Sequence, residues 1–101
     1  MTAISFGDRV QIRSTVLTQE LGLAGRIGMV HGSTTPSITG VSVIGLPTSD
    51  YALAVALEGD PEATWFEPGL VEFVDHAPGT TVKLADRTFT RSPEGEWKEN
   101  G

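Results

Sequence analysis

The sequence predicts an all-β protein. Apolar residues alternate with polar ones over short runs, which is the pattern of strands that bury one face. The 101 residues include 12 glycines and 6 prolines, and these punctuate the chain too often for long helices. We expect one small domain over residues 1–75, followed by a C-terminal β-hairpin extension over residues 76–101.

The first strand is expected within Phe6–Arg13, where Val10 and Ile12 alternate with polar side chains. The next strand belongs to the glycine-rich stretch Leu23–Gly32, around which the rest of the chain is organised. Gly28 falls inside that strand, and a glycine there indicates a bulge or the close approach of another backbone. A strongly bent strand in a small barrel needs such a position.

The middle of the chain alternates between short strands and turns. A polar loop is expected over Ser33–Gly40, and strands follow at Val41–Ile44, Tyr51–Leu57, Thr64–Glu67 and Leu70–Val74. The alanines of the second of these runs would also suit a helix, but the run is short and ends in a turn. The alternation predicts that most of the core comes from Val10, Ile12, Ile27, Met29, Val30, Leu53, Val55, Leu57, Leu70, Val71 and Val74.

The end of the chain predicts a hairpin. After a linker-like segment at Asp75–Thr80, the strand-like runs Thr81–Leu84 and Arg87–Arg91 are separated by only two residues. A second turn at Ser92–Gly95 leads to Glu96–Lys98.

Composition excludes several functions. Thirteen acidic and seven basic residues give a formal net charge of −6. Affinity for nucleic acid needs clustered Lys and Arg, and the basic residues here are dispersed, so we expect no nucleic-acid partner. Without cysteine there are no disulfides, no thiol catalysis and no thiolate zinc sites. Because no signal peptide or membrane-spanning run is recognisable, we expect a cytoplasmic protein with no membrane partner and no cofactor.

The ordered series of motifs resembles a known superfamily. Gly7–Ile12 followed by Gly25–Val30 resembles the opening of SH3-like small barrels, which include KOW-type domains. Tyr51–Leu57 followed by Trp65–Val74 is similar to the second half of the same barrel. The pattern is most similar to accessory-subunit versions, such as the variable chain of ferredoxin–thioredoxin reductase and the barrel of the nitrile hydratase β subunit.

This resemblance covers residues 5–75 and implies an SH3-like small barrel. The basic surface of ribosomal KOW domains is missing here, as are the His and Arg positions of a nitrile hydratase β chain. The resemblance therefore implies a fold and carries no activity with it, because a shared fold is not a shared function.

Three groups of residues could carry chemistry, and each has a simpler structural interpretation. His31 lies beside a Ser- and Thr-rich loop and could serve a small hydrolase as its base, but no spacing singles out a nucleophile. Asp75 and His76 are neighbours, so in a strand they point to opposite faces and make a poor pair of metal ligands. The acidic turn Glu58–Glu62 lacks the spacing of a calcium loop. We therefore expect neither a catalytic nor a metal site.

The candidate binding residues are aromatic and arginine side chains. Trp65 and Phe66 are adjacent in an expected strand, so one should point inward and the other outward, unless the hairpin covers both. In the hairpin, Arg87, Phe89 and Arg91 share one face of a strand and could form an aromatic anchor flanked by two guanidinium groups. The alternative is that Phe89 packs onto the barrel and both arginines lie along its acidic surface.

These observations favour a non-catalytic, small acidic module that binds a larger partner protein. One alternative is an accessory or regulatory subunit of a redox or hydratase-type enzyme. Another is a KOW-like domain associated with nucleic acid, against which the net charge argues.

Overall fold

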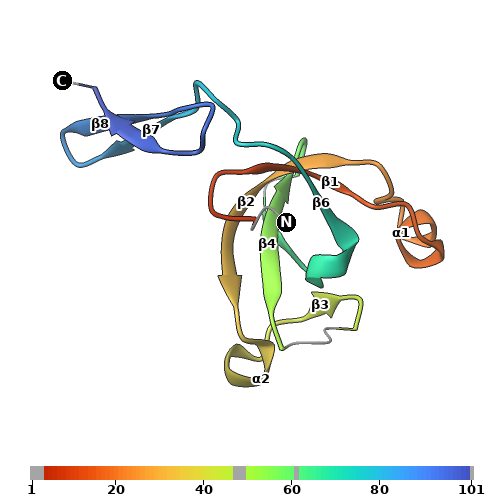
Figure 1. Cartoon of the computed structure of the whole chain (residues 1–101). Coiled ribbons are helices and arrows are strands. Elements are labelled where there is room, and N and C mark those ends of the chain that lie inside the picture. The colour runs from red at the N-terminus through yellow and green to blue at the C-terminus, as the bar shows by residue number, and fades with distance from the viewer. Residues whose placement is uncertain (1–3, 47–49, 61, 101) are drawn as a thin grey trace.

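The computed structural model describes residues 4–46, 50–60 and 62–100. Over these ranges the chain forms a six-stranded sheet, a three-stranded sheet and two short α-helices (Figure 1). The all-β class predicted from the sequence is therefore confirmed. We call the six-stranded sheet the main sheet and the three-stranded sheet the tail sheet.

The secondary-structure elements are short and follow one another closely. In chain order they are β1 (Arg9–Ile12), α1 (Val16–Glu20), β2 (Ile27–Thr34), α2 (Pro36–Thr39), β3 (Val43–Ile44), β4 (Ala52–Leu57), β5 (Thr64–Phe66), the 3₁₀ turn η1 (Pro68–Leu70), β6 (Val71–Asp75), β7 (Thr81–Leu84), β8 (Arg87–Arg91) and β9 (Trp97–Glu99).

The polar loop expected over Ser33–Gly40 is not a loop throughout. Strand β2 continues to Thr34, and the helix α2 follows it. Pro36 occupies the first helical position, where its missing N–H would have had no partner within the helix. Gly40 ends the helix with a φ of 71°, a left-handed conformation that glycine adopts without strain.

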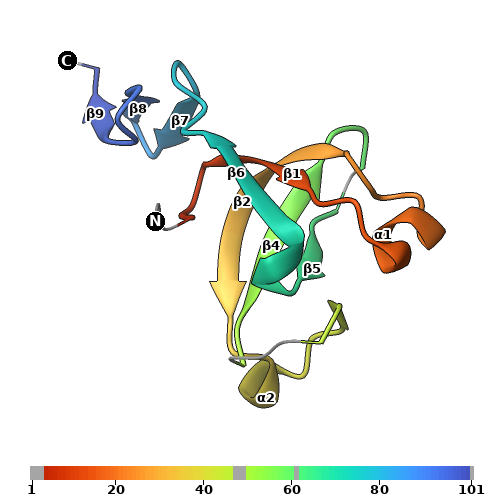
Figure 2. The same cartoon turned by 45° about the vertical axis from the view of Figure 1, so that its right-hand side comes forward.

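The main sheet is strongly curled. Strands β1, β2, β4 and β5 pair antiparallel in the order β1–β2–β4–β5, and β6 returns to pair antiparallel with β1. Strand β3 adds to β5 in parallel, so β3 and β6 stand at the two ends of the hydrogen-bonded order. The two ribbon views show β6 crossing over the other strands rather than lying flat beside them (Figures 1 and 2).

The core lies inside this curl. Its buried cluster comprises Val10, Ile12, Val30, Leu53, Val55, Leu57, Phe66 and Val71, and Ile44 and Leu70 pack against it. Alternation in the sequence predicted seven of these eight core residues; the eighth, Phe66, was not among the predicted core residues. Because these residues come from β1, β2, β4, β5 and β6, the curled sheet encloses a single core.

Three of the predicted core residues lie elsewhere. Val74 is 43% exposed, because it is three residues beyond the buried Val71 and only alternate residues share a face of a strand. Ile27 and Met29 are half-buried, because they alternate with Val30, which faces the core.

Gly28 confirms the predicted close approach of two backbones. A Cβ at this position would lie 2.7 Å from the carbonyl oxygen of Ala56 and 2.8 Å from Cγ1 of Val55, closer than side chains pack. The pairing of β2 with β4 also shifts register between Val30 and Gly32. The bulge and the glycine together let β2 bend around the core.

The tail sheet contains the predicted hairpin and one further strand. Strand β7 pairs antiparallel with β8, and β8 pairs antiparallel with β9. The chain enters it from β6 through residues 76–80. The molecule measures 46 × 30 × 29 Å, and the tail sheet projects from one end of it (Figure 1).

Candidate interaction surface

The tail sheet has one largely apolar face and one polar face, because residues paired across strands project to the same side. Phe89 lies opposite Val82, Arg87 opposite Leu84, and Arg91 opposite Trp97. We call the face that they share the tail face; its side chains are Val82, Leu84, Arg87, Phe89, Arg91, Trp97 and Glu99. The opposite face carries Thr81, Lys83, Thr88, Thr90 and Lys98.

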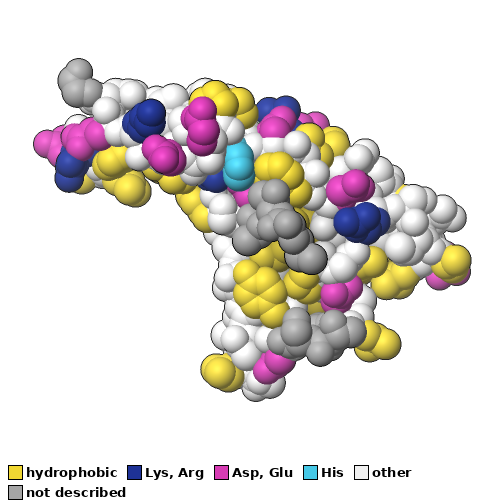
Figure 3. All heavy atoms as spheres, viewed as in Figure 1, with side chains coloured by type: hydrophobic (Ala, Val, Ile, Leu, Met, Phe, Trp, Pro, Cys, Tyr) yellow, Lys and Arg dark blue, Asp and Glu magenta, His cyan; other side chains and the backbone are white. Residues whose placement is uncertain are grey.

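The centre of the tail face is an open apolar groove of about 280 Å³. Its lining residues are Val82, Leu84, Phe89, Trp97 and, from the segment before β1, Phe6. Leu84 is 61% exposed and Phe6 is 52% exposed. Hydrophobic side chains gather along the lower side of the tail sheet in the space-filling view (Figure 3). Apolar side chains gathered in an exposed groove are typical of a protein interaction site.

The outer end of the tail face carries an exposed ion pair. Arg87 donates from Nε to Oε1 of Glu99 over 2.9 Å, and its Nη2 donates to Oε2 of the same carboxylate. This hydrogen bonding to Glu99 raises the pKa of Arg87 above its usual value, against a smaller opposing effect of desolvation. The guanidinium also lies 5.7 Å from the centroid of the Phe89 ring. One charge of each sign therefore borders the apolar groove.

The inner end of the tail face is fixed to the main sheet by Arg91. Its Nη2 donates to Oδ1 of Asp8 over 2.8 Å, and its Nη1 donates to the carbonyl oxygen of Phe6. Arg91 is 3% exposed and Asp8 is fully buried. This finding corrects the expectation that Arg91 offers its guanidinium to a partner, because both of its Nη groups are engaged within the chain.

His76 and Ser5 also contact Asp8 where the two sheets meet. Nδ1 of His76 lies 2.8 Å from Oδ1 of Asp8 and 3.4 Å from Nη2 of Arg91. The backbone N–H of Ser5 donates to Oδ2 of Asp8 over 2.8 Å. Each carboxylate oxygen of Asp8 thus has a hydrogen-bonding neighbour, which a buried carboxylate requires. We call Asp8, His76 and Arg91 the junction.

Aromatic packing closes the junction on the side of the groove. Trp97 has its ring centroid 5.1 Å from the guanidinium carbon of Arg91 and 6.0 Å from the ring centroid of Phe6. Gly7 makes room for them: a Cβ there would lie 2.5 Å from Nη1 of Arg91 and 2.8 Å from Cζ2 of Trp97. The glycine therefore lets the tail sheet approach the chain just ahead of β1.

Of the two aromatic neighbours in β5, Phe66 points into the core and is fully buried. The expectation that it could anchor a partner is corrected, because its ring lies among the core side chains. Trp65 projects from the opposite side of the strand, is half-buried and pairs with Ala54 and Val43. It remains a candidate contact outside the tail face.

The residues considered for chemistry are dispersed. His31 is exposed, and Asp60 of the acidic turn forms an ion pair with Arg26 over 3.3 Å. Asp75 lies 3.5 Å from Arg9, while the neighbouring His76 belongs to the junction. Among the residues that the structure describes, no three His, Asp or Glu side chains are grouped to hold a metal ion.

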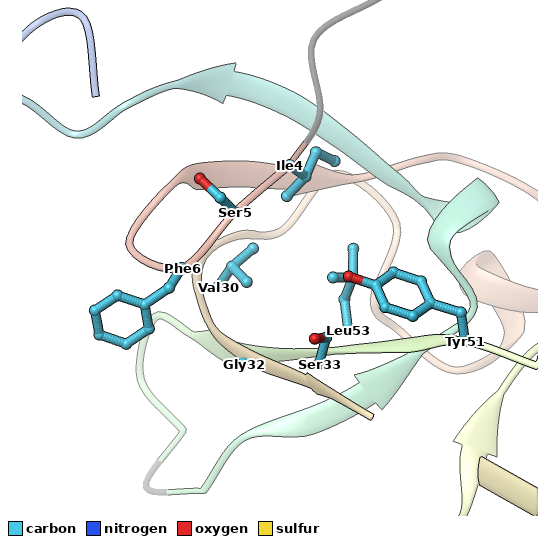
Figure 4. A pocket seen from close by; sticks show the side chains of 8 residues that line it. All are labelled: Ile4, Ser5, Phe6, Val30, Gly32, Ser33, Tyr51 and Leu53. Carbon is cyan, nitrogen blue, oxygen red and sulfur yellow. The ribbon is translucent and has the colours of Figure 1, made fainter. Parts of the chain in front are cut away.

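A second, smaller cavity lies between the N-terminal segment and strands β2 and β4. Its volume is about 90 Å³. The close-up shows Ile4, Leu53 and Tyr51 directed toward a common space, while Phe6 points away from it (Figure 4). Pockets that bind small molecules usually measure about 300–1,000 Å³, so this cavity is too small for most ligands.

Sequence reasoning missed Phe6, Val82, Leu84 and Trp97 as parts of the surface, and Asp8 and His76 as parts of the junction. The alternation of Val82 and Leu84 was a signal for the tail face, because apolar residues two apart in a strand share a side. The Gly7–Asp8 pair predicted only a turn, since nothing near it in the sequence indicates that Asp8 binds the distant Arg91.

Within the described ranges, no helix is both long and apolar enough to cross a membrane. No protein-family model, curated protein or solved structure matches this chain.

Proposed function

We propose that this chain is a non-catalytic protein–protein interaction module that docks on a larger protein through its tail face. The observation that carries the proposal is the apolar groove formed by Val82, Leu84, Phe89, Trp97 and Phe6. Binding energy at protein interfaces concentrates in aromatic and arginine side chains near the centre of the contact. The tail face supplies the aromatic rings of Phe89 and Trp97 together with Arg87, which is paired with Glu99.

The attachment of the tail sheet to the segment ahead of β1 supports the same proposal. Arg91 and Trp97 belong to the tail face and also take part in the contacts that hold the tail sheet to the segment ahead of β1. A partner would therefore meet a preorganised surface, and less conformational entropy would be lost on binding.

The placement of the basic side chains argues against a nucleic-acid partner. Arg9, Arg13 and Arg26 form ion pairs with Asp75, Glu72 and Asp60. Arg87 is paired with Glu99, and Arg91 with Asp8. Each arginine of the chain thus has an acidic neighbour, and a phosphate backbone would have to compete with it.

We also propose an SH3-like small barrel for residues 1–75. The strand order β6–β1–β2–β4–β5 supports this assignment, because the last strand of the expected barrel returns to pair with the first. An accessory subunit of a redox or hydratase-type enzyme is one form of the proposed function, in which the larger partner is that enzyme.

Site-specific photocrosslinking in cells that express the chain naturally tests the proposal. A photoreactive amino acid at Leu84 reports on the tail face, and one at the adjacent Lys83 reports on the opposite face and is the matched control. We expect a crosslinked band containing one larger protein from position 84, absent from position 83 and lost when Phe89→Asp is added. Equal crosslinking from both positions, or crosslinking that survives Phe89→Asp, would contradict the proposal.

A further inference from the structure

We infer that a second copy of this chain covers the tail face whenever the larger partner is absent. This inference rests on the proposed function in one respect, namely that the tail face is a protein-binding surface. The two occupants would then exclude each other, and the self-paired molecule would be the resting form of the module.

Covering the exposed apolar side chains of the tail face is favourable, and a two-fold dimer covers them without leaving a surface for further copies to bind. Leu84 and Phe6 leave much of their apolar surface in water, which favours association. When a surface pairs with its own copy about a two-fold axis, both copies are covered and no further molecule can add.

The distribution of charge allows this pairing. Residues 1–75 contain nine acidic and three basic side chains, whereas residues 76–101 contain four of each, so the whole net charge of −6 belongs to the first part. The tail sheet projects from one end of the elongated molecule (Figure 1). Tail-to-tail pairing therefore brings two neutral segments together. It directs the acidic parts away from each other, and charges more than about 8–10 Å apart are largely screened at physiological salt.

The charges of the tail face are complementary to those of a second copy of the same face. Arg87 and Glu99 lie side by side at the outer end, so the face carries one charge of each sign next to the groove. In a two-fold pairing this surface meets itself, and Arg87 of one copy can approach Glu99 of the other. A face with charges of a single sign could not do this, because like charges would meet.

The contact is small, so the association should be weak. Stable interfaces use about 20–30 residues on each side, many more than the seven side chains of the tail face. We expect a dissociation constant on the order of micromolar or weaker. This is weak enough for a larger partner to displace the second copy.

Two variants of the full chain, each with one charge of the Arg87–Glu99 pair reversed, test the inference by sedimentation velocity. Arg87→Glu leaves two negative charges at the outer end of the tail face, and Glu99→Arg leaves two positive charges. We expect the wild type to dimerise as its concentration rises from about 1 μM to 1 mM, and each variant alone to dimerise at least about tenfold more weakly. An equimolar mixture of the two variants should recover dimers that contain one copy of each.

Only a contact between chains predicts that recovery, because both variants break the Arg87–Glu99 pair within their own chain. Net charge does not explain it either: the variants carry −8 and −4, and their mutual repulsion is close to that between two copies at −6. Leu84→Asp should also abolish dimers, whereas Thr81→Asp should not, since it adds the same charge to the same strand on the opposite face. Thermal unfolding of each variant checks that it is folded.

A wild type that stays monomeric up to about 1 mM would overturn the inference, as would a mixture that associates no better than the separate variants. Both outcomes leave the proposed function to its own test, because crosslinking of a larger protein at position 84 does not require a dimer. A dimer that persists with Leu84→Asp would show that the second copy uses another surface, and that result also overturns the inference.

Discussion

The guanidinium of Arg91 and the carboxylate of Asp8 form a buried ion pair across 83 positions of sequence, with Nη2 and Oδ1 2.8 Å apart. The pair joins the last strand of the predicted hairpin to the turn that precedes β1. Neither side chain is accessible, so the strength of the pair depends on its remaining hydrogen bonds, which His76, Ser5 and the carbonyl oxygen of Phe6 supply.

Arg91→Met should lower the free energy of unfolding by about 3–5 kcal/mol, because it leaves the carboxylate of Asp8 buried without its main cationic partner. Urea unfolding followed by tryptophan fluorescence measures the loss, and Trp97 beside the guanidinium reports directly on the junction. Arg87→Met is the matched control. It removes an exposed arginine from the same face and should leave the unfolding midpoint nearly unchanged. Equal losses in the two variants would contradict a structural role specific to Arg91.

Removing both charges of the junction should cost less than removing one. Asp8→Asn combined with Arg91→Met leaves no unpaired charge, so the double variant should recover part of the stability lost in Arg91→Met. The comparison is a double-mutant cycle measured in urea. Strictly additive losses would mean that the two side chains do not interact in solution.

Gly7→Ala should lower the melting temperature more than Gly79→Ala. Both glycines have a φ of 87°, so both substitutions incur the cost of a left-handed backbone, about 1–2 kcal/mol. Only at Gly7 does the added methyl group also collide with Arg91 and Trp97, whereas nothing lies within 4 Å of a Cβ at Gly79. Differential scanning calorimetry of the two variants isolates the collision, and a smaller loss at Gly7 would argue against the close approach of the tail sheet.

Phe66→Ala should destabilise the protein by about 3–5 kcal/mol, because it removes a fully buried ring and leaves a cavity in the core. Trp65→Ala, at the half-buried neighbour that points to the other side of β5, should cost clearly less. Chemical unfolding of both variants gives the comparison. The opposite order of losses would mean that β5 presents its other face to the core.

Generic double-stranded DNA or RNA should show no measurable binding at physiological salt. The physical reason is the net charge of −6 together with the engagement of all five arginines in ion pairs. Fluorescence anisotropy of a labelled duplex, titrated with the full chain, is the measurement. A signal that weakens steeply as salt is added would reveal a basic strip, and Lys83 and Lys98 on the polar face of the tail sheet would be the first residues to replace.

Local alternation was enough to predict most strands and most of the core, because the side-chain period of a strand is fixed by backbone geometry. Alternation failed where apolar residues occupy both faces of one strand, because the pattern then does not show which face is buried. Val71 and Val74 cannot both face inward from one strand, and either of Trp65 and Phe66 could have been the buried one. The choice depends on which side of each strand the curled sheet encloses, and that is a property of the assembled sheet.

The sequence by itself determined the all-β class and the position of the hairpin, since each follows from residues near one another in the chain. At Gly28 the sequence indicated a bulge or a close backbone approach, without showing that the distant Ala56 is the neighbour. It also placed Arg87, Phe89 and Arg91 on one side of a strand. Only the tertiary structure decided their separate roles: Arg91 is buried against Asp8, while Arg87 and Phe89 border an open groove. The physical reason is that a buried charge must find an opposite charge, and no local pattern in the sequence shows which distant residue the fold brings to it.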